Sequence, residues 1–181
     1  MMTGPAVSRG SSGGIDRRPI VVGLDGSENA TRALEWALRE AARVRSDLEV
    51  VHVWHRLTAS GTSYGSEHAA AAYVAAEVRQ AVAAVTPTVD RLPTILERTA
   101  NGSAARTLIA LSRNARLLVL GQSRHAAVRE LLPGSVGAIC VRRSPAPVAI
   151  VPEHGDVVVM GQAHSRLDAW PSRTHDQPVE V

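Results

Sequence analysis

The sequence of 181 residues contains no lysine and no phenylalanine, so all 20 of its basic residues are arginines. Only 3% of the residues are aromatic, and a buried core must therefore be built from alanine, valine, leucine and isoleucine. With 45% hydrophobic residues the chain still has enough apolar side chains for a folded core, which argues against disorder throughout. The length suits a single domain with or without tails.

Cysteine and long apolar runs are also scarce. The single cysteine, Cys140, excludes a disulfide within the chain and any metal site built on several cysteines. No apolar run approaches the roughly 20 residues that a membrane helix needs. Residues 1–18 lack the apolar segment of a secretory signal. We therefore expect a cytoplasmic protein without a membrane partner.

The high sequence pI of about 9.9 comes from arginine. The guanidinium stays charged to very high pH, so a small excess of arginine over Asp and Glu raises the pI strongly. Residues 1–18 carry +2 (three Arg, one Asp), residues 19–152 carry +4 (15 Arg, 11 acids) and residues 153–181 carry −3 (two Arg, five acids). Basic residues alternate with acids through the middle of the chain. A mixed, solvated surface fits this pattern better than a nucleic-acid face, so we expect no nucleic-acid partner.

Composition divides the chain into three segments. Residues 1–18 are rich in Gly, Ser and Pro without a periodic apolar pattern, which predicts a flexible leader. Residues 19–152 hold the periodic apolar patterns and form the predicted domain. Residues 153–181 are polar apart from the short run Val157–Met160, and they predict a tail that is disordered or lies at a dimer interface.

Short apolar runs alternate with segments of helical spacing between residues 19 and 152. The predicted strands are 20–24, 48–54, 94–98, 117–120 and 147–152, and the predicted helices are 28–45, 67–85, 103–112 and 135–142. This alternation predicts an α/β fold in which helices cover both faces of a parallel sheet. The wholly apolar runs 20–24 and 117–120 predict central strands. The prolines around 148–151 suit a strand at the sheet edge.

A candidate ligand site follows from the topology. Ligands of such sheets bind at the carboxyl ends of the strands, where the strand order reverses. Here that edge carries the turn Asp25-Gly26-Ser27 and the segment from Gly121 onward. A strand-end glycine lets a ligand approach the backbone closely, and Gly134-Ser135 at a helix start offers N–H groups and a hydroxyl to a phosphate. These features predict a nucleotide site.

The same residues resemble the universal stress protein family over nearly all of 19–152. The marks of the resemblance are the opening 21–27 (VVGLDGS), the strand end 51–53 (VHV), Gly121 with Gly134-Ser135, and the closing 145–148 (PAPV). Nucleotide-binding members carry a glycine, two residues, a second glycine, nine residues and then Gly-Ser or Gly-Thr. The spacing here matches that pattern, but the second glycine is replaced by Arg124.

The resemblance implies a Rossmann-like adenine-nucleotide-binding fold with five parallel strands in the order 3-2-1-4-5. The implied cofactor is ATP or another adenine nucleotide, with no metal apart from nucleotide-associated Mg²⁺. Asp25 and the backbone of Val53 would contact the adenosine, while the residues after the fourth strand would hold ribose and phosphates. The full set of expected cofactor-binding residues is Gly23, Asp25, Val53, Leu120, Gly121, Arg124, Gly134, Ser135 and Val136.

Arg124 leaves two functions open. A non-glycine residue costs on the order of 1 kcal/mol where a positive φ is needed, and its side chain would obstruct phosphates that must approach the backbone. Arginine is also a good phosphate partner and could compensate. The chain is therefore either a stress-regulatory protein that binds an adenine nucleotide, or a universal stress protein domain that has lost ATP binding and acts as a protein-interaction module.

Catalysis is not expected, apart from slow ATP hydrolysis. The sequence shows no evident general base or metal cluster, and a hydrolase or ligase on the related fold would need a phosphate-activating motif that is missing. Ser27 is expected to cap a helix, and Asp25 could simply accept a hydrogen bond in its turn. His52 and Cys140 are expected to be buried core residues.

A homodimer is implied by the resemblance, because family members commonly pair through the last strand. Here Val148, Ala149, Ile150 and Val151 form a short apolar edge of the kind that pairs with another chain. The run Val157–Met160 would either extend that interface or cover it. Regulatory protein partners are expected, but the sequence does not identify them.

Overall fold

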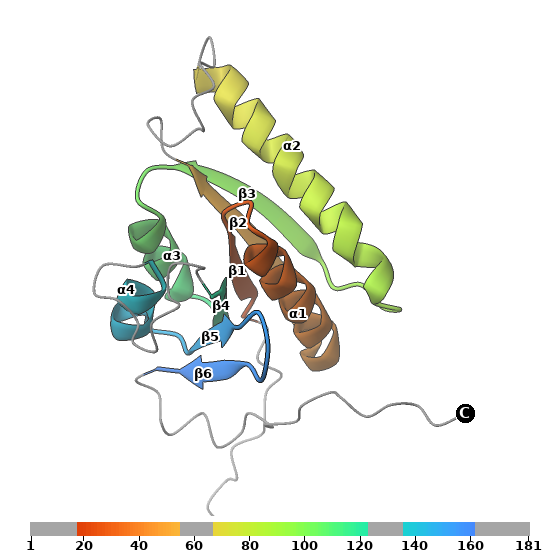
Figure 1. Cartoon of the computed structure of the whole chain (residues 1–181), viewed down its shortest axis with the longest axis vertical. Coiled ribbons are helices and arrows are strands. Elements are labelled where there is room, and N and C mark those ends of the chain that lie inside the picture. The colour runs from red at the N-terminus through yellow and green to blue at the C-terminus, as the bar shows by residue number, and fades with distance from the viewer. Residues whose placement is uncertain (1–17, 55–66, 123–135, 162–181) are drawn as a thin grey trace, which may run out of the picture.

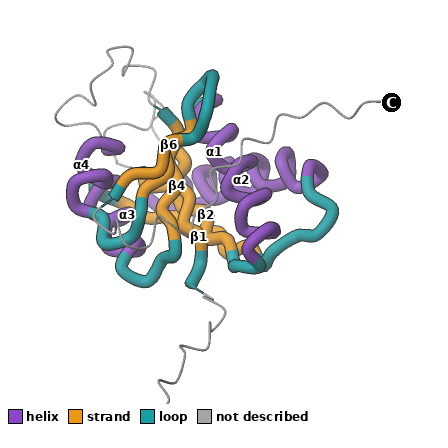
Figure 2. The backbone as a smooth tube through the Cα atoms, turned by 90° about the horizontal axis from the view of Figure 1, so that it is seen from below, coloured by secondary structure: helices purple, strands orange, loops and turns teal. Residues whose placement is uncertain are grey.

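Strands and helices alternate along the chain in the computed structural model, which describes residues 18–54, 67–122 and 136–161. The strands are β1 (Ile20–Leu24), β2 (Leu48–Trp54), β3 (Ile95–Asn101), β4 (Leu117–Gly121), β5 (Val148–Val151) and β6 (Val158–Met160). The helices are α1 (Glu28–Val44), α2 (Glu67–Val85), the short 3₁₀ turn Thr86–Thr88, α3 (Ala104–Ser112) and α4 (Val136–Arg143). Helices α1 and α2 lie on one face of the sheet, and α3 and α4 lie on the other (Figures 1 and 2).

The strand order in the sheet is β3-β2-β1-β4-β5-β6. The first five strands are parallel, and β1 and β4 are central, as the two wholly apolar runs predict. The switch in strand order falls between β1 and β4, since the chain moves outward from β1 in one direction to β3 and then returns to β4. The carboxyl ends of the neighbouring strands β1 and β4 therefore lie side by side, at the place where sheets of this kind bind ligands.

The predicted number of strands was wrong by one, because the sheet ends in a sixth strand. β6 runs antiparallel to β5, with the residue pairs Val148–Met160, Ala149–Val159 and Ile150–Val158. β5 is therefore an inner strand, and its placement at the sheet edge was wrong. The prolines at 147 and 152 stand outside these pairs, so they do not interrupt hydrogen bonding to β6. The run at 157–160 covers the β5 edge in this structure.

The core is divided by the sheet into two apolar layers. Side chains of β1, β2 and β4 that point to one face pack against α1 and α2, and they are joined by the alternate residues of β5. The opposite side chains pack against α3 and α4. Ala, Val, Leu and Ile supply almost all of these residues, as the lack of aromatics requires. Trp54 instead joins a small cluster with Ala70 and Val74 of α2.

Cys140 of α4 is fully buried in the layer between the sheet and α3–α4. It packs there as a small apolar side chain, which confirms the sequence prediction. Burial disfavours the thiolate and raises the pKa of the thiol to about 11. Cys140 is therefore held as a neutral thiol at physiological pH.

Candidate ligand site at the carboxyl ends of the strands

The turn after β1 is closed by Asp25. The backbone N–H of Ser27 donates to Asp25 Oδ1 at 3.0 Å, and Gly26 between them has a φ of +78° that favours glycine. Ser27 then caps α1, since its Oγ accepts a hydrogen bond from the N–H of Ala30 at 3.2 Å. The capping prediction for Ser27 is confirmed. Asp25 is exposed, and its second carboxylate oxygen bonds to none of the described residues.

β2 extends past its last pair with β1. The final β1–β2 pair is Leu24–His52, whereas β2 continues to pair with β3 through Trp54. The carbonyl of Trp54 accepts from Gly102 N–H on the β3 side at 2.9 Å. Peptide groups of successive strand residues face opposite neighbours, so the carbonyl of Val53 faces the β1 side beyond the end of β1. No described strand residue pairs with this carbonyl, and extending the β1–β2 register by one residue places Val53 next to Asp25.

Gly121 ends β4 against the first turn of α1. A Cβ at this position would lie 2.5 Å from the carbonyl oxygen of Asn29 and 2.9 Å from the nitrogen of Ala30. Only glycine fits, because the atoms that a side chain would meet belong to helix backbone. The sequence pattern predicted that a ligand approaches the backbone closely at this glycine. In the structure, the close approach is that of helix α1.

Gly23 and Leu120 lie within the sheet rather than on its edge. A Cβ on Gly23 would come within 2.8 Å of Leu120 Cδ2, and Leu120 is itself buried in the α3–α4 layer. The two residues therefore pack against each other behind the candidate site. Val136, the first residue of α4, is exposed. The remaining expected residues, Arg124, Gly134 and Ser135, lie outside the described residues.

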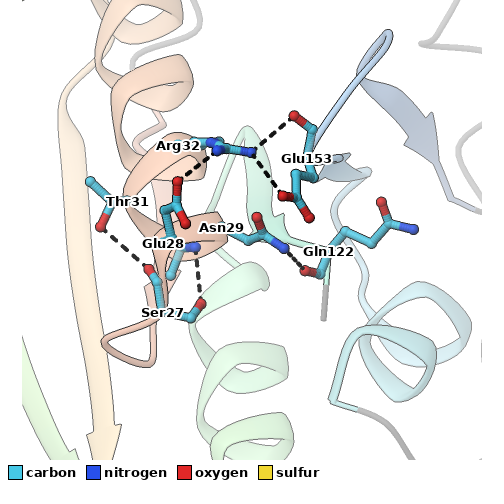
Figure 3. A network of polar contacts seen from close by, with 8 residues as sticks. Ser27, Glu28, Asn29, Thr31, Arg32, Gln122 and Glu153 are labelled. Carbon is cyan, nitrogen blue, oxygen red and sulfur yellow. Dashed lines mark hydrogen bonds and ion pairs between the residues drawn. The ribbon is translucent and has the colours of Figure 1, made fainter. Parts of the chain in front are cut away.

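Asn29 joins α1 to the end of β4, a role that the sequence analysis missed. Its Nδ2 donates to the backbone carbonyl of Gln122 at 2.6 Å (Figure 3). The N–H of Gln122 donates to the carbonyl of Val151 at 2.9 Å. Asn29 is 4% exposed, and its Oδ1 has no partner in the described part of the chain. One signal was available: Asn29 lies one turn before Ala33 and two turns before Ala37, on the buried side of the helix.

Arg32 links the same helix to the segment after β5. Its guanidinium donates to Glu28 at 2.7 Å within α1 and to the backbone carbonyl of Glu153 at 2.9 Å (Figure 3). The carboxylate of Glu153 lies 4.0 Å away. The first two turns of α1 thus hold the chain at the ends of both β4 and β5. Sequence offered no signal for this contact, because it joins positions 121 residues apart.

His52 lies half-buried on the α1–α2 side of β2. Burial lowers its pKa below the usual 6.5, against smaller opposing effects of Glu77 and Asp25. The imidazole is therefore neutral at physiological pH. In the described ranges no group of three or more His, Cys, Asp or Glu residues is placed to hold a metal ion. Within the same ranges no helix is long and apolar enough to cross a membrane.

Several known proteins are similar to this chain. The universal stress protein Rv1996 of Mycobacterium tuberculosis is 30% identical over 151 residues, which cover 74% of this chain and 48% of that protein. The chain thus spans about half the length of the curated relatives that it matches. A universal stress protein solved in complex with cAMP is 28% identical, with a TM-score of 0.59 over 74% of this chain and 95% of that one.

The fold is shared more widely than the sequence. The universal stress protein UspA from Lactobacillus plantarum, at 22% identity, superimposes with a TM-score of 0.58 over 75% of this chain and 97% of its own. The sequence model of the universal stress protein family matches residues 16–152, which include β1 to β5 and α1 to α4. This chain belongs to the universal stress protein family.

Proposed function

We propose that this chain binds an adenine nucleotide, ATP or a close relative, at the carboxyl edge of its sheet and acts as a stress-regulatory protein without efficient turnover. The observation that carries the proposal is the pair of acceptors that lie side by side at the ends of β1 and β2. One is the second carboxylate oxygen of Asp25, and the other is the carbonyl of Val53. The cAMP complex of a relative with the same fold supports this class of ligand.

The chemistry of the edge fits the adenosine part of such a ligand. Ribose hydroxyls and the adenine amino group are hydrogen-bond donors, and the Asp25 carboxylate and the Val53 carbonyl are acceptors. Phosphates need N–H donors or cations, which the amino end of α4 beginning at Val136 can supply. Gly134, Ser135 and Arg124 complete the proposed phosphate-binding residues. Mg²⁺ would bind with the phosphates and not through a dedicated cluster of side chains.

No side chain of the turn is proposed as a catalytic residue. The Ser27 hydroxyl is engaged as the cap of α1, and the Asp25 carboxylate holds the turn that positions it. The buried Cys140 thiol lies in the core and its pKa is raised, so it is not a nucleophile. Binding of the nucleotide, rather than its conversion, is therefore the proposed activity.

Equilibrium titration of the full chain with a fluorescent ATP analogue tests the proposal. We expect saturable binding that unlabelled ATP, AMP or cAMP displaces and that GTP displaces less well. Asp25→Asn keeps the size of the side chain but removes its charge, and should weaken binding by about tenfold, the equivalent of roughly 1.4 kcal/mol for one charge-assisted hydrogen bond. Asp47→Asn is the matched control, because Asp47 precedes β2 at the opposite edge of the sheet.

The alternative function is that of a protein-interaction module without ATP. Arg124 in place of the motif glycine is the observation that favours it. Absence of saturable binding at millimolar nucleotide would refute the first proposal. A gain of affinity in Arg124→Gly would then assign the loss of binding to that single side chain.

A further inference from the structure

Some arginines in the described part of the chain are paired with acids, and others, including Arg45, Arg79 and Arg91, form no ion pair with a described residue. In α1, Arg32, Arg39 and Arg43 each form an ion pair with a glutamate of the same helix. On the edge strand β3, Arg98 pairs with Glu49 of β2 at 2.6 Å. These arginines are neutralised within the chain, as is usual for a solvated surface of mixed charge.

Helices α3 and α4 and the described segments next to them carry arginines without acids. Residues 102–122 and 136–152 contain five arginines (106, 113, 116, 142 and 143) and no Asp or Glu. Arg106, Arg113, Arg142 and Arg143 are exposed, and none of the four forms an ion pair with a described residue. We call these four residues the arginine face.

The fold places the two helices that carry these residues on one face of the sheet. Helices α3 and α4 are neighbours in both views, on the face of the sheet opposite α1 and α2 (Figures 1 and 2). Arg106 and Arg113 are seven residues apart, about two helical turns, and therefore lie on the same side of α3. Arg142 and Arg143 occupy the last turn of α4. Both helices end at the amino ends of the strands that follow them, opposite the proposed nucleotide site.

A favourable effect on the helix dipole does not account for this arrangement. Basic residues in the last turn stabilise a helix, and Arg113, Arg142 and Arg143 do stand at the ends of α3 and α4. Arg43 stands in the last turn of α1 in the same way, but there Glu40 accompanies it. The dipole is stabilised by a cation at the carboxyl end and does not require acids to be absent from both helices.

We propose that the arginine face binds the phosphate backbone of a nucleic-acid duplex without reading its base sequence. Neither α3 nor α4 contains an aromatic residue, so single-stranded bases have nothing to stack on. Among the exposed large apolar residues of the described chain, only Val136 belongs to these helices, and it lies at the far end of α4 from Arg142 and Arg143.

The lack of apolar anchors decides between classes of partner. A protein interface is held by buried aromatic or aliphatic anchors, and a membrane-binding helix inserts an apolar face. The arginine face offers charge alone. A duplex, with one negative charge for about every 1.7 Å of its axis, is the partner that charge alone can hold. The expectation of no nucleic-acid partner came from charge counted along the chain, whereas this proposal comes from the two neighbouring helices α3 and α4, which contain arginine but no Asp or Glu.

Fluorescence anisotropy with the full chain and a labelled DNA duplex of about 20 base pairs tests this proposal. The face variant replaces the four arginines of the face by glutamine. The control variant replaces Arg39, Arg45, Arg79 and Arg91 by glutamine, all of which are exposed and lie on α1, α2 or the loops that follow them. Each variant lowers the formal net charge from +3 to −1, so the two differ only in where the charge is lost.

The expected result is non-specific binding with a steep salt dependence. If each arginine contacts one phosphate, the slope of log K against log salt is about −3.6, and affinity falls roughly 150-fold between about 50 and about 200 mM salt. The face variant should bind the duplex much more weakly and with little salt dependence. The control variant should keep both the affinity and the salt dependence of the wild type. Circular dichroism checks that both variants are folded.

Three results would overturn the proposal. The first is the absence of saturable binding even at low salt. The second is an equal loss of affinity in both variants, which would mean that net charge alone attracts the duplex. The third is displacement of the duplex by poly-glutamate of equal charge as readily as by unlabelled duplex, which would assign the face to an acidic protein. Because neither variant changes Asp25 or Val53, a failure here leaves the nucleotide proposal to be decided by its own titration.

Discussion

The side-chain amide of Asn29 donates a 2.6 Å hydrogen bond to the backbone carbonyl of Gln122, and so ties the first turn of α1 to the end of β4. The chain passes from Gln122 directly into residues 123–135, which include the motif position Arg124. The buried Asn29 amide therefore fixes the position of Gln122, where the proposed phosphate-binding segment begins. The two residues are 93 positions apart in the chain.

Replacing Asn29 by alanine should destabilise the fold. The Gln122 carbonyl would lose its partner, and an unpaired buried acceptor costs about 1–3 kcal/mol. Urea unfolding followed by circular dichroism measures the loss. Thr31→Ala is the control, since its hydroxyl bonds to Ser27 on the exposed side of the same turn and its removal should cost less. Equal losses in the two variants would contradict a special role for the Asn29 amide.

Gly121→Ala should be destabilising, whereas Gly137→Ala should be neutral or favourable. The new methyl at 121 would lie 2.5 Å from helix backbone, and overpacking of this kind costs about 1–3 kcal/mol. At Gly137 the nearest atom is Ile150 Cδ1 at 3.9 Å, and alanine in a helix gains up to about 1 kcal/mol over glycine. Thermal unfolding should move in opposite directions for the two variants. A stable Gly121→Ala protein would mean that α1 can shift away from β4.

His52 should make the fold less stable in mild acid. Burial lowers the pKa of His52 in the folded chain below its ordinary 6.5, so the unfolded chain binds the proton more tightly. Stability is full above about 6.5 and falls as the pH drops from there towards the folded-state pKa. The loss of unfolding free energy between about pH 8 and about pH 5 should be smaller in His52→Gln than in the wild type.

His154→Gln serves as the control for that comparison, because His154 is exposed in the loop between β5 and β6. It should keep the acid sensitivity of the wild type. An unchanged pH dependence in His52→Gln would assign the acid sensitivity to other groups.

β6 should govern any dimer that forms through β5. We propose that a second copy pairs with Val148–Val151 only when β6 has left that edge, since both would use the same peptide groups. Replacing Val158 and Val159 together by proline should release β6, because the N–H groups of successive strand residues face opposite sides and one of the two must face β5.

Light scattering at micromolar concentration measures the effect. The double-proline variant should move towards twice the chain mass of 19.2 kDa, while a double threonine variant at the same positions keeps its strand-forming side chains and should match the wild type. A monomeric double-proline variant would argue against β5 as a dimer edge.

The sequence predicted the sheet well where burial alone decides the structure. The apolar runs 20–24 and 117–120 can be stable only between two layers of helices, so their central positions follow from composition. β6 could not be found in this way. Three residues in a polar segment form a strand only because β5 presents an open edge to them, and that edge exists only in the folded sheet.

The roles of site residues could be predicted from the sequence where a residue interacts with residues close to it in the chain. Ser27 caps the helix that it precedes, and a Ser at that place is a local signal. Gly121 and Asn29 act across the fold: the glycine makes room for the helix, and the asparagine holds the strand end. A one-dimensional pattern marks the glycine as unusual but does not say whether a ligand or a helix takes the space.

The lone thiol of Cys140, fully buried with a pKa raised to about 11, makes the molecule its own unfolding probe. A thiol-specific reagent can attack it only when the layer between the sheet and α3–α4 opens, because the thiolate is the reactive form and the core conceals it. With no second cysteine to react, each alkylated molecule carries a single label, at Cys140. The rate of labelling in native buffer therefore reports how often this half of the core is exposed, even in a crude mixture where spectroscopy would fail.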